Sequence, residues 1–207
     1  MGFFSQFILI IPGILMAITI HEYAHGWMAN RLGDPTARYA GRLTLNPLHH
    51  LDPIGTLMLF IAHIGWAKPV PINPQYFSNP KYDIIWVSLA GPMANIICAF
   101  ACGALFRFFI NLSTLLAYIF MYAVLINLVL CAFNIIPIPP LDGSKILMGI
   151  LPRQQAYEFS KLEPFGPFIL LFIIMFGRMT GFNIIWSIIS RFVTTFSYLF
   201  TGEVIGI

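Results

Sequence analysis

The sequence predicts an all-α protein, a polytopic transmembrane helical bundle with a re-entrant or extended element between the first and second full spans. Of its 207 residues, 58% are hydrophobic and only 9% are charged, and the mean hydropathy is +0.83. A soluble domain carries about 25% charged residues. Several apolar runs approach the ~20 residues that a membrane-spanning helix needs, whereas the strands of a membrane barrel would be alternating segments of about 10 residues.

Apolar runs and the turn signals between them predict the elements in order. The first run covers about residues 7–29, and a polar connection with Gly-Asp-Pro, Asn-Pro and Asp-Pro turns follows it. Residues 54–66 would reach only about 20 Å as a helix, which is short of a ~30 Å hydrocarbon core. The proline-rich stretch 67–83 should be extended rather than helical. Further helices are expected at residues 84–110, 115–136, 165–176 and 182–200.

The positions of the basic residues predict the orientation in the membrane. If residues 54–66 enter the membrane and return, eight basic side chains fall on one side of it. Because cytoplasmic loops carry an excess of Lys and Arg, this side should be cytoplasmic and the N-terminus outside. We therefore expect an integral, multi-pass protein of the plasma or inner membrane. The eight residues are Arg31, Arg38, Arg42, Lys68, Lys81, Lys145, Arg153 and Lys161.

Two further features exclude classes of function. The chain has no basic patch outside its short loops, so a nucleic-acid partner is not expected. Cys98, Cys102 and Cys131 all lie in apolar stretches. We interpret them as small core residues rather than as a disulfide set or a thiolate metal site.

The stretch His21-Glu22-Tyr23-Ala24-His25 has the form H-E-x-x-H at the end of the first run. Residues four apart share a helix face, so both imidazoles can bind one zinc ion. Glu22 lies about 100° further round the helix, where it can act as a general base toward a water molecule. A charged residue inside a spanning helix costs roughly 2.5–3.5 kcal/mol, which suggests partners that offset the cost. The alternative is an interfacial cluster that extends toward the headgroups.

A zinc site of this kind needs a third protein ligand, because catalytic zinc usually has three and leaves a fourth position to water. Apart from Glu22, only Asp142 among the acidic residues lies at the end of a long span. The prolines that precede it bar a regular helix, and Asp142 alone could equally belong to a simple Asp-Gly turn. Topology favours the ligand, because the span 115–136 ends on the face of His21 only if residues 54–66 do not cross.

The remaining histidines are interpreted as structural. His49 and His50 follow an Asn-Pro turn and are expected to be loop residues at the membrane interface. His63 lies in the short run 54–66. There, a hydrogen-bonded packing role is favoured over a second metal site.

Three motifs resemble those of the site-2 protease family and occur in the expected order. They are H-E-x-x-H in the first span, Gly91-Pro92-x-x-Asn95 in the next full span, and Asn134 followed by Pro140-Leu141-Asp142-Gly143. The resemblance covers roughly residues 15–148. It implies an intramembrane zinc metalloendopeptidase that hydrolyses peptide bonds in the transmembrane segments of protein substrates. The chain resembles a minimal branch of the family, without a PDZ or nucleotide-sensing domain.

The resemblance also implies roles for particular residues. One zinc ion would be held by His21, His25 and Asp142, Glu22 would be catalytic, and Asn95 and Asn134 would bind substrate. The alternative for Asn95 is a hydrogen bond that only joins neighbouring helices. Residues 1–207 would form a single membrane-embedded protease domain, with a catalytic core at about 7–148 and C-terminal helices at about 165–200. The alternative is a membrane transporter or metal carrier that uses the same His/His/Asp site. Transporters usually show internal repeats, and the sequence has none.

Overall fold

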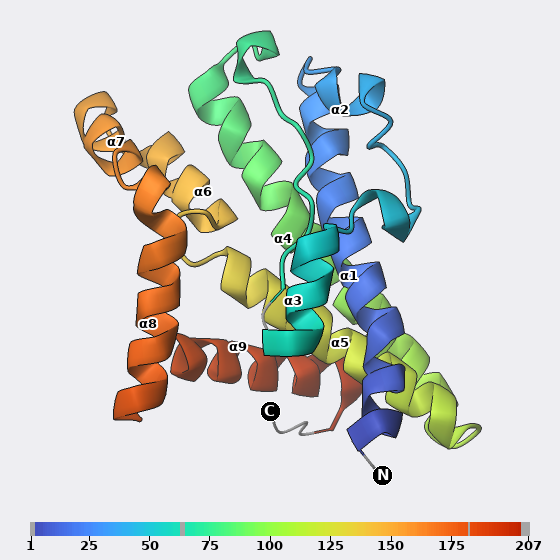
Figure 1. Cartoon of the computed structure of the whole chain (residues 1–207). Helices are drawn as coiled ribbons and strands as arrows, with labels where there is room; N and C mark the ends of the chain where they lie inside the picture. The colour runs from blue at the N-terminus through green and yellow to red at the C-terminus, as the bar shows by residue number, and fades with distance from the viewer. Residues whose placement is uncertain (1–2, 63–64, 182, 204–207) are drawn as a thin grey trace.

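Long α-helices dominate the structure (Figure 1), a computed structural model that describes residues 3–62, 65–181 and 183–203. In these ranges the only β-pairing is one isolated bridge, so the predicted all-α class is confirmed. The helices are α1 (Phe3–Arg31), α2 (Thr36–Tyr39), η1 (Pro47–His49), α3 (Pro53–Ala62), η2 (Pro74–Tyr76), α4 (Pro80–Phe109), α5 (Thr114–Asn134), α6 (Asp142–Ile150), α7 (Arg153–Ser160), η3 (Glu163–Phe165), α8 (Gly166–Thr180) and α9 (Ile184–Thr201).

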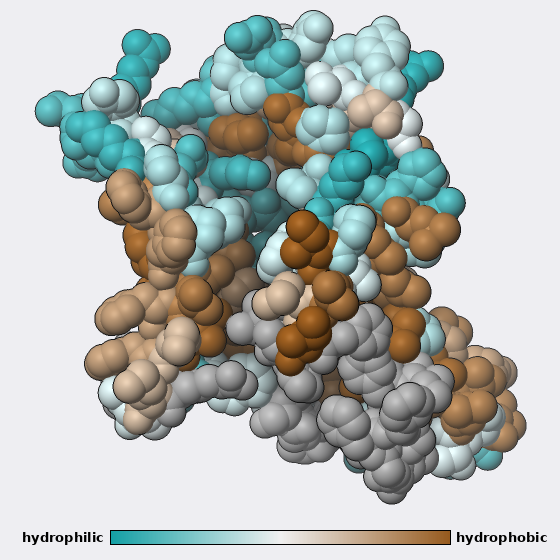
Figure 2. Space-filling model, in the orientation of Figure 1, coloured by the Kyte–Doolittle hydropathy of each residue, from teal (hydrophilic) through white to brown (hydrophobic). Residues whose placement is uncertain are grey.

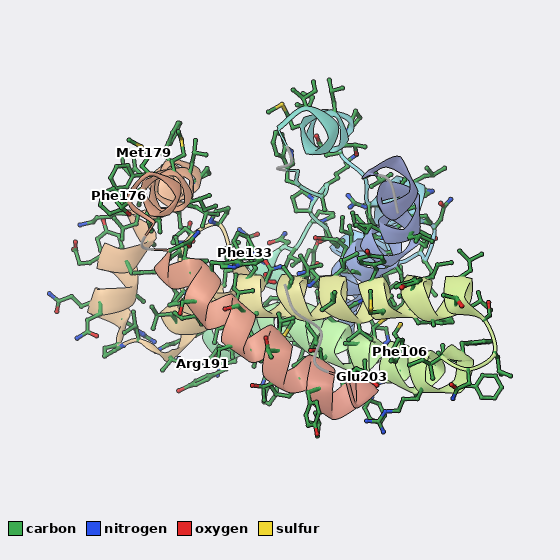
Figure 3. All side chains as sticks on the ribbon, turned by 90° about the horizontal axis from the view of Figure 1, so that it is seen from below. Phe106, Phe133, Phe176, Met179, Arg191 and Glu203 are labelled. Atoms are coloured by element: carbon green, nitrogen blue, oxygen red, sulfur yellow. The ribbon has the colours of Figure 1, made fainter. Side chains whose placement is uncertain are left out.

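The core of the bundle is formed by α1, α4 and α5, which pack against one another, while α9 packs across the α4–α5 pair (Figures 1 and 3). Small residues of α4 face larger ones of α5 and α9, such as Leu128 and Val193. Small residues let helix backbones approach closely in a membrane. Cys98, Cys102 and Cys131 are buried and free, as predicted.

The surface of the molecule is that of a membrane protein. Three stretches of the described residues are long and apolar enough to cross a bilayer, namely α4, α5 and Arg153–Gly177, which includes most of α8. Hydrophilic residues gather at the end where α2 and α7 lie (Figure 2). On α8, Phe168, Phe172 and Met179 are exposed, and Figure 3 shows Met179 on this helix well away from Phe106 on α4. Such apolar exposure suits a lipid-facing helix.

Local sequence explains where α4 begins and where α5 begins and ends. α4 begins with Pro80 in its first turn, a position where the missing N–H of proline costs nothing. The side chain of Ser113 caps α5 by accepting a hydrogen bond from the Leu116 N–H at 3.4 Å. α5 ends at Asn134, just before the proline-containing stretch 135–141. The prediction that these prolines break the helix is confirmed.

The short element predicted between the first and second full spans is present. α3 has 10 residues and spans only about 15 Å at 1.5 Å per residue. The chain then returns, because Leu51 and Ala67 form an antiparallel bridge and the Lys68 N–H donates to the His50 carbonyl at 2.9 Å. Both ends of the element therefore lie side by side. His63 falls outside the described residues.

The structure differs from the sequence-based expectation in the stretch 137–165, which was expected to be a connection. It contains α6, α7 and the short η3. These helices are too short to produce a long apolar run, and Pro152 separates the first two. α6 packs against α4, with Gly149 close to the side chain of Ile85. Asp142 consequently lies in the first turn of a helix rather than on an isolated turn.

Candidate metal centre

Three ligand atoms converge between α1 and α6. His21 and His25 lie one turn apart on α1, and their Nε2 atoms are 3.0 Å apart. Each Nε2 lies 3.1 Å from Oδ2 of Asp142. The side chains of His21, His25 and Asp142 together form a group that could hold a metal ion. All three residues are buried, with exposed fractions of 5%, 6% and 6%.

Hydrogen bonding at the opposite ring nitrogen determines which atom of His21 faces this group. Nδ1 of His21 lies 2.6 Å from Oδ1 of Asn95. The amide nitrogen of Asn95 donates to the Ala17 carbonyl at 3.0 Å and to Oδ1 of Asn127 at 2.9 Å. Because that nitrogen has two acceptors, the oxygen of Asn95 is the atom that faces His21. It therefore accepts a hydrogen bond from Nδ1–H, and Nε2 of His21 keeps its lone pair.

The second imidazole is arranged in the same way, and the resulting site fits zinc. His25 donates from Nδ1 to the Val87 carbonyl at 2.7 Å, so its Nε2 also carries a lone pair. Two such nitrogens and a carboxylate oxygen at 3.0–3.1 Å repel one another without a cation between them. Tetrahedral ligands at about 2.0–2.1 Å from zinc are about 3.3 Å apart, close to these separations. The donor set is also one that zinc prefers.

The position of Asp142 follows from tight packing at the start of α6. A Cβ atom on the next residue, Gly143, would lie 2.1 Å from the Ile135 carbonyl oxygen, so only glycine fits there. Oδ2 of the buried Asp142 side chain consequently faces the two imidazole nitrogens.

The backbone of α4 closes the site from the other side. A Cβ atom on Gly91 would lie 2.5 Å from Nε2 of His25 and 2.7 Å from Cε1 of His21. Real Cβ atoms essentially never approach other atoms closer than 3.0 Å. The glycine of the Gly91-Pro92-x-x-Asn95 motif is thus required because both imidazoles pack directly on the helix at this point.

Glu22 follows His21 on α1 and is half-buried. Its Oε2 accepts a hydrogen bond from the Val70 N–H at 2.9 Å. Pro69 and Pro71 flank Val70 and have no N–H to donate, so Val70 is the sole backbone donor of this triplet. Among the described residues, Oε1 of Glu22 has no hydrogen-bond partner, which leaves this oxygen free to accept a proton.

Two buried charged side chains hold the extended segment 67–73 beside α1. The Arg42 guanidinium donates to the Lys68 carbonyl at 2.6 Å and to the Pro69 carbonyl at 3.2 Å. Oδ2 of Asp34 accepts from the Asn73 N–H at 2.7 Å. The extended conformation predicted for residues 67–83 is therefore correct for the first part of this stretch, before η2 and α4 begin.

The structure brings together most of the predicted site residues. His21, His25 and Asp142 converge, Asn95 contacts His21, and Glu22 adjoins His21 on α1. The predicted substrate contacts of Asn95 and Asn134 stay predictions. Asn95 is fully buried among protein partners. Asn134, the last residue of α5, donates to the carbonyl of Leu130 one turn earlier at 3.0 Å.

The loop histidines do not join this group. His49 is exposed. His50 is fully buried and donates from Nε2 to the Thr44 carbonyl at 2.8 Å, which is a structural contact within the loop.

The sequence interpretation missed three residues that support the site, either by contacting one of its residues or by holding the segment beside it. Asn127 was detectable, since an amide in the middle of an apolar span is costly and tends to be functional. Arg42 is interpreted from the sequence only as one of the basic loop residues that set the orientation. No feature of the sequence points to Val70, because its contact with Glu22 uses a backbone N–H.

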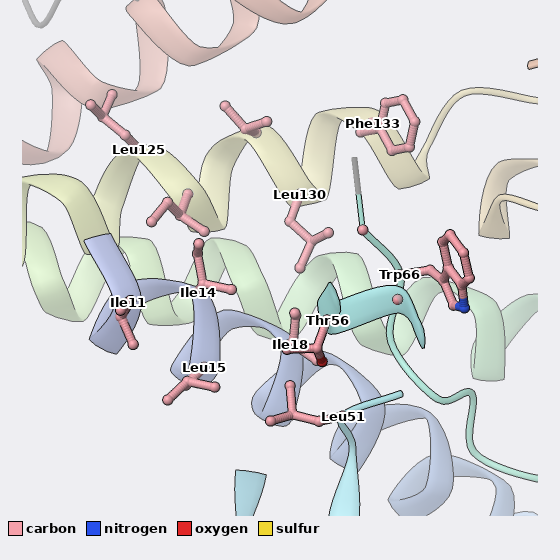
Figure 4. Close-up of a pocket in the computed structure, with 14 residues that line it drawn as sticks. Ile11, Ile14, Leu15, Ile18, Leu51, Thr56, Trp66, Leu125, Leu130 and Phe133 are labelled. Carbon is pink, nitrogen blue, oxygen red and sulfur yellow. The ribbon is translucent and has the colours of Figure 1, made fainter. Parts of the chain in front are cut away.

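An apolar cavity of about 380 Å³ opens between α1 and α5, beside the start of α3 (Figure 4). Side chains of both spans line it, among them Ile14, Ile18 and Leu130. Leu51 and Trp66, at the two ends of the re-entrant element, also line it. The cavity is therefore bounded by the same element that continues into the segment holding Glu22.

A membrane-embedded helical bundle that buries two imidazoles and a carboxylate around a zinc-sized space, beside a glutamate, has the features of an intramembrane zinc metalloprotease. Comparison with known proteins agrees. "Putative zinc metalloprotease YwhC" of Bacillus subtilis is 36% identical over 185 residues, which cover 86% of this chain and 84% of that protein. Residues 110–177 match the model of peptidase family M50. The chain belongs to this family.

More distant relatives agree as well. "Zinc metalloprotease MJ0392" of Methanocaldococcus jannaschii is 26% identical over 184 residues, covering 87% of this chain and 45% of that protein. The solved structure of a site-2 protease from the same organism has a TM-score of 0.50 and 21% identity, covering 100% of this chain and 82% of that chain. This structural similarity supports the fold.

Proposed function

We propose that His21, His25 and Asp142 hold one zinc ion, that Glu22 is the general base, and that the substrates are membrane-embedded protein segments. The observation that carries this proposal is the convergence of three potential ligand atoms within 3.1 Å of one another. A glutamate directly after the first imidazole adds the group that peptide hydrolysis requires. A transport site for metal has no need of it.

The chemistry divides between the metal and Glu22. When bound, zinc supplies Lewis acidity toward a water molecule and the substrate carbonyl. Oε1 of Glu22 accepts a proton from the attacking water, and the same oxygen then delivers that proton to the leaving nitrogen. The Val70 N–H holds Oε2 throughout, so the carboxylate turns only one oxygen toward the reaction.

Substrates are proposed to enter sideways from lipid and to be cut in their cytoplasmic half. With the N-terminus outside and the first span starting near Phe7, His21 lies about 21 Å along the helix and roughly 9 Å from the cytoplasmic face. The cavity between α1 and α5 is almost entirely apolar and suits a transmembrane segment. The segment must unwind to expose an amide, so residues of low helix propensity near the cut should favour cleavage.

Zinc content and peptide hydrolysis, measured on the same purified samples, test the proposed roles. Glu22→Gln should retain about one zinc per chain and lose cleavage of a membrane-segment library, because the amide cannot accept the proton. His21→Ala should lose both. His49→Ala is the matched control, since His49 is exposed and does not belong to the group of His21, His25 and Asp142. A Glu22→Gln variant that still cleaves would overturn the assignment of the base.

Cysteine labelling tests the proposed orientation. The exposed residues Ala40 and Gln75 precede and follow the re-entrant element, and single cysteines at both should react from the cytoplasm. Leu112 between α4 and α5 is exposed and should react only from outside. The native cysteines are buried and give a low background. Labelling of Ala40→Cys and Gln75→Cys from opposite sides would contradict the topology.

A further inference from the structure

Asn127 lies in the middle of α5 and is fully buried. Its Nδ2 donates to the Ala123 carbonyl one turn earlier at 2.8 Å. A side-chain amide has one donor end and one acceptor end. Because the carbonyl of Ala123 can only accept, it selects the orientation of Asn127, and Oδ1 of Asn127 points toward Asn95 on α4.

That orientation is passed on to the metal centre. Oδ1 of Asn127 and the Ala17 carbonyl both accept from Nδ2 of Asn95. The two N–H groups of Asn95 are thereby used, and its oxygen faces Nδ1 of His21 at 2.6 Å. A chain of hydrogen bonds thus runs from α5 through α4 to α1 and ends on the ring nitrogen opposite the proposed ligand atom.

We propose that Asn127 is a positioning residue that keeps His21 in the tautomer with its proton on Nδ1 and its Nε2 lone pair available to zinc. This inference rests on the proposed role of His21 as a ligand. Partners that hold the second nitrogen of a ligating histidine orient the ring and raise its basicity. Asn127 would orient the His21 ring indirectly, because it hydrogen-bonds Asn95 and Asn95 in turn hydrogen-bonds His21.

Loss of Asn127 has a definite structural consequence. With an apolar residue there, one buried N–H of Asn95 has no acceptor, and the Ala17 carbonyl alone holds the amide in its orientation. An amide held by one bond instead of two can also turn Nδ2 toward Nδ1 of His21. In that orientation the imidazole accepts at Nδ1 and carries its proton on Nε2, where it blocks the metal. Removing such outer partners typically lowers metal affinity by about 10–100-fold, and we expect Asn127→Leu to fall in this range.

The test measures zinc affinity of the purified full chain by competition with a chromophoric chelator, together with thermal unfolding of the metal-free protein. Asn127→Asp should restore near wild-type affinity, since a buried carboxyl is protonated and its O–H and C=O replace both ends of the amide. Val124→Ala is the packing control, because Val124 is a fully buried core residue of the same helix. It should unfold at a lower temperature and bind zinc normally.

The outcomes separate the possibilities. Wild-type zinc affinity in Asn127→Leu overturns the inference, as does an equal loss in Val124→Ala, which would indicate general packing. Where Asn127→Leu does not fold, Asn127→Ala removes the same acceptor with less bulk and decides the question in the same way. His21→Ala is measured alongside. If it retains zinc, the proposed ligand set fails, whereas a loss of zinc in His21→Ala with none in Asn127→Leu rejects only the positioning role.

Discussion

Gly91→Ala is expected to abolish high-affinity zinc binding without weakening the helix that carries it. The added Cβ would lie 2.5 Å from Nε2 of His25 and 2.7 Å from Cε1 of His21. Alanine is favoured over glycine in a helix interior by about 1 kcal/mol, so the backbone itself gains from the change. The contact with the imidazoles therefore determines the result.

The displacement that the contact forces can be read from the structure. Ordinary contact begins at 3.4 Å, so the ring of His25 must withdraw by about 0.9 Å, beyond the ≈ 0.5 Å within which functional groups must be held. Hydrogen bonds to Asn95 and Val87 oppose such a movement of the two rings. We expect zinc affinity to fall by about 100-fold or more, the upper end of the effects seen on disturbing the partners of a ligand.

Competition with a chelator measures the affinity, and Gly103→Ala is the matched control. Gly103 lies on the same helix, and a Cβ there would meet Phe200 of α9 at 2.8 Å rather than a proposed ligand. This variant should lower the unfolding temperature and leave zinc binding intact. If Gly91→Ala binds zinc as tightly as the wild type, the close approach of α4 to the imidazoles is not a feature of the working site.

Three further predictions follow from the contacts of the site. Val70→Pro removes the N–H that holds Glu22, so this variant should bind zinc normally but have a kcat lowered about 10-fold or more. A hydrogen bond to a charged group contributes roughly 1.5–3 kcal/mol, which sets this magnitude. The control Val70→Ile keeps the N–H and should keep the wild-type kcat. Arg42→Lys loses the pair of guanidinium hydrogen bonds to the segment 67–73 and should also lower kcat at unchanged zinc affinity. A parallel loss of zinc affinity would contradict this prediction. Zinc at about 100 times its Kd should stabilise the wild type by about 2.7 kcal/mol, and a thermal shift of equal size in Asp142→Asn would argue against this ligand.

The sequence was sufficient for the parts of the site that depend on regular geometry. His21 and His25 share a helix face because of their spacing, and the short run 54–66 could not cross a bilayer, which placed Asp142 on the same side as His21. It was insufficient where a contact depends on tertiary packing. α6 and α7 lack a long apolar run, and the partner of Glu22 is a backbone N–H 48 positions away, so no pattern of residue types records either feature.

The proposed ligands and the proposed base are held by different parts of the fold. The imidazoles are oriented by α4, through Val87 and Asn95, and the carboxylate by the packing of α6 on α4. Glu22 is instead held by the segment 67–73, which is not helical and depends on a few hydrogen bonds to side chains. Zinc affinity should therefore respond to changes at the residues that contact the imidazoles and Asp142, whereas kcat should respond to changes in the extended segment. A movement of that segment would alter the orientation of Glu22 while the metal stays bound.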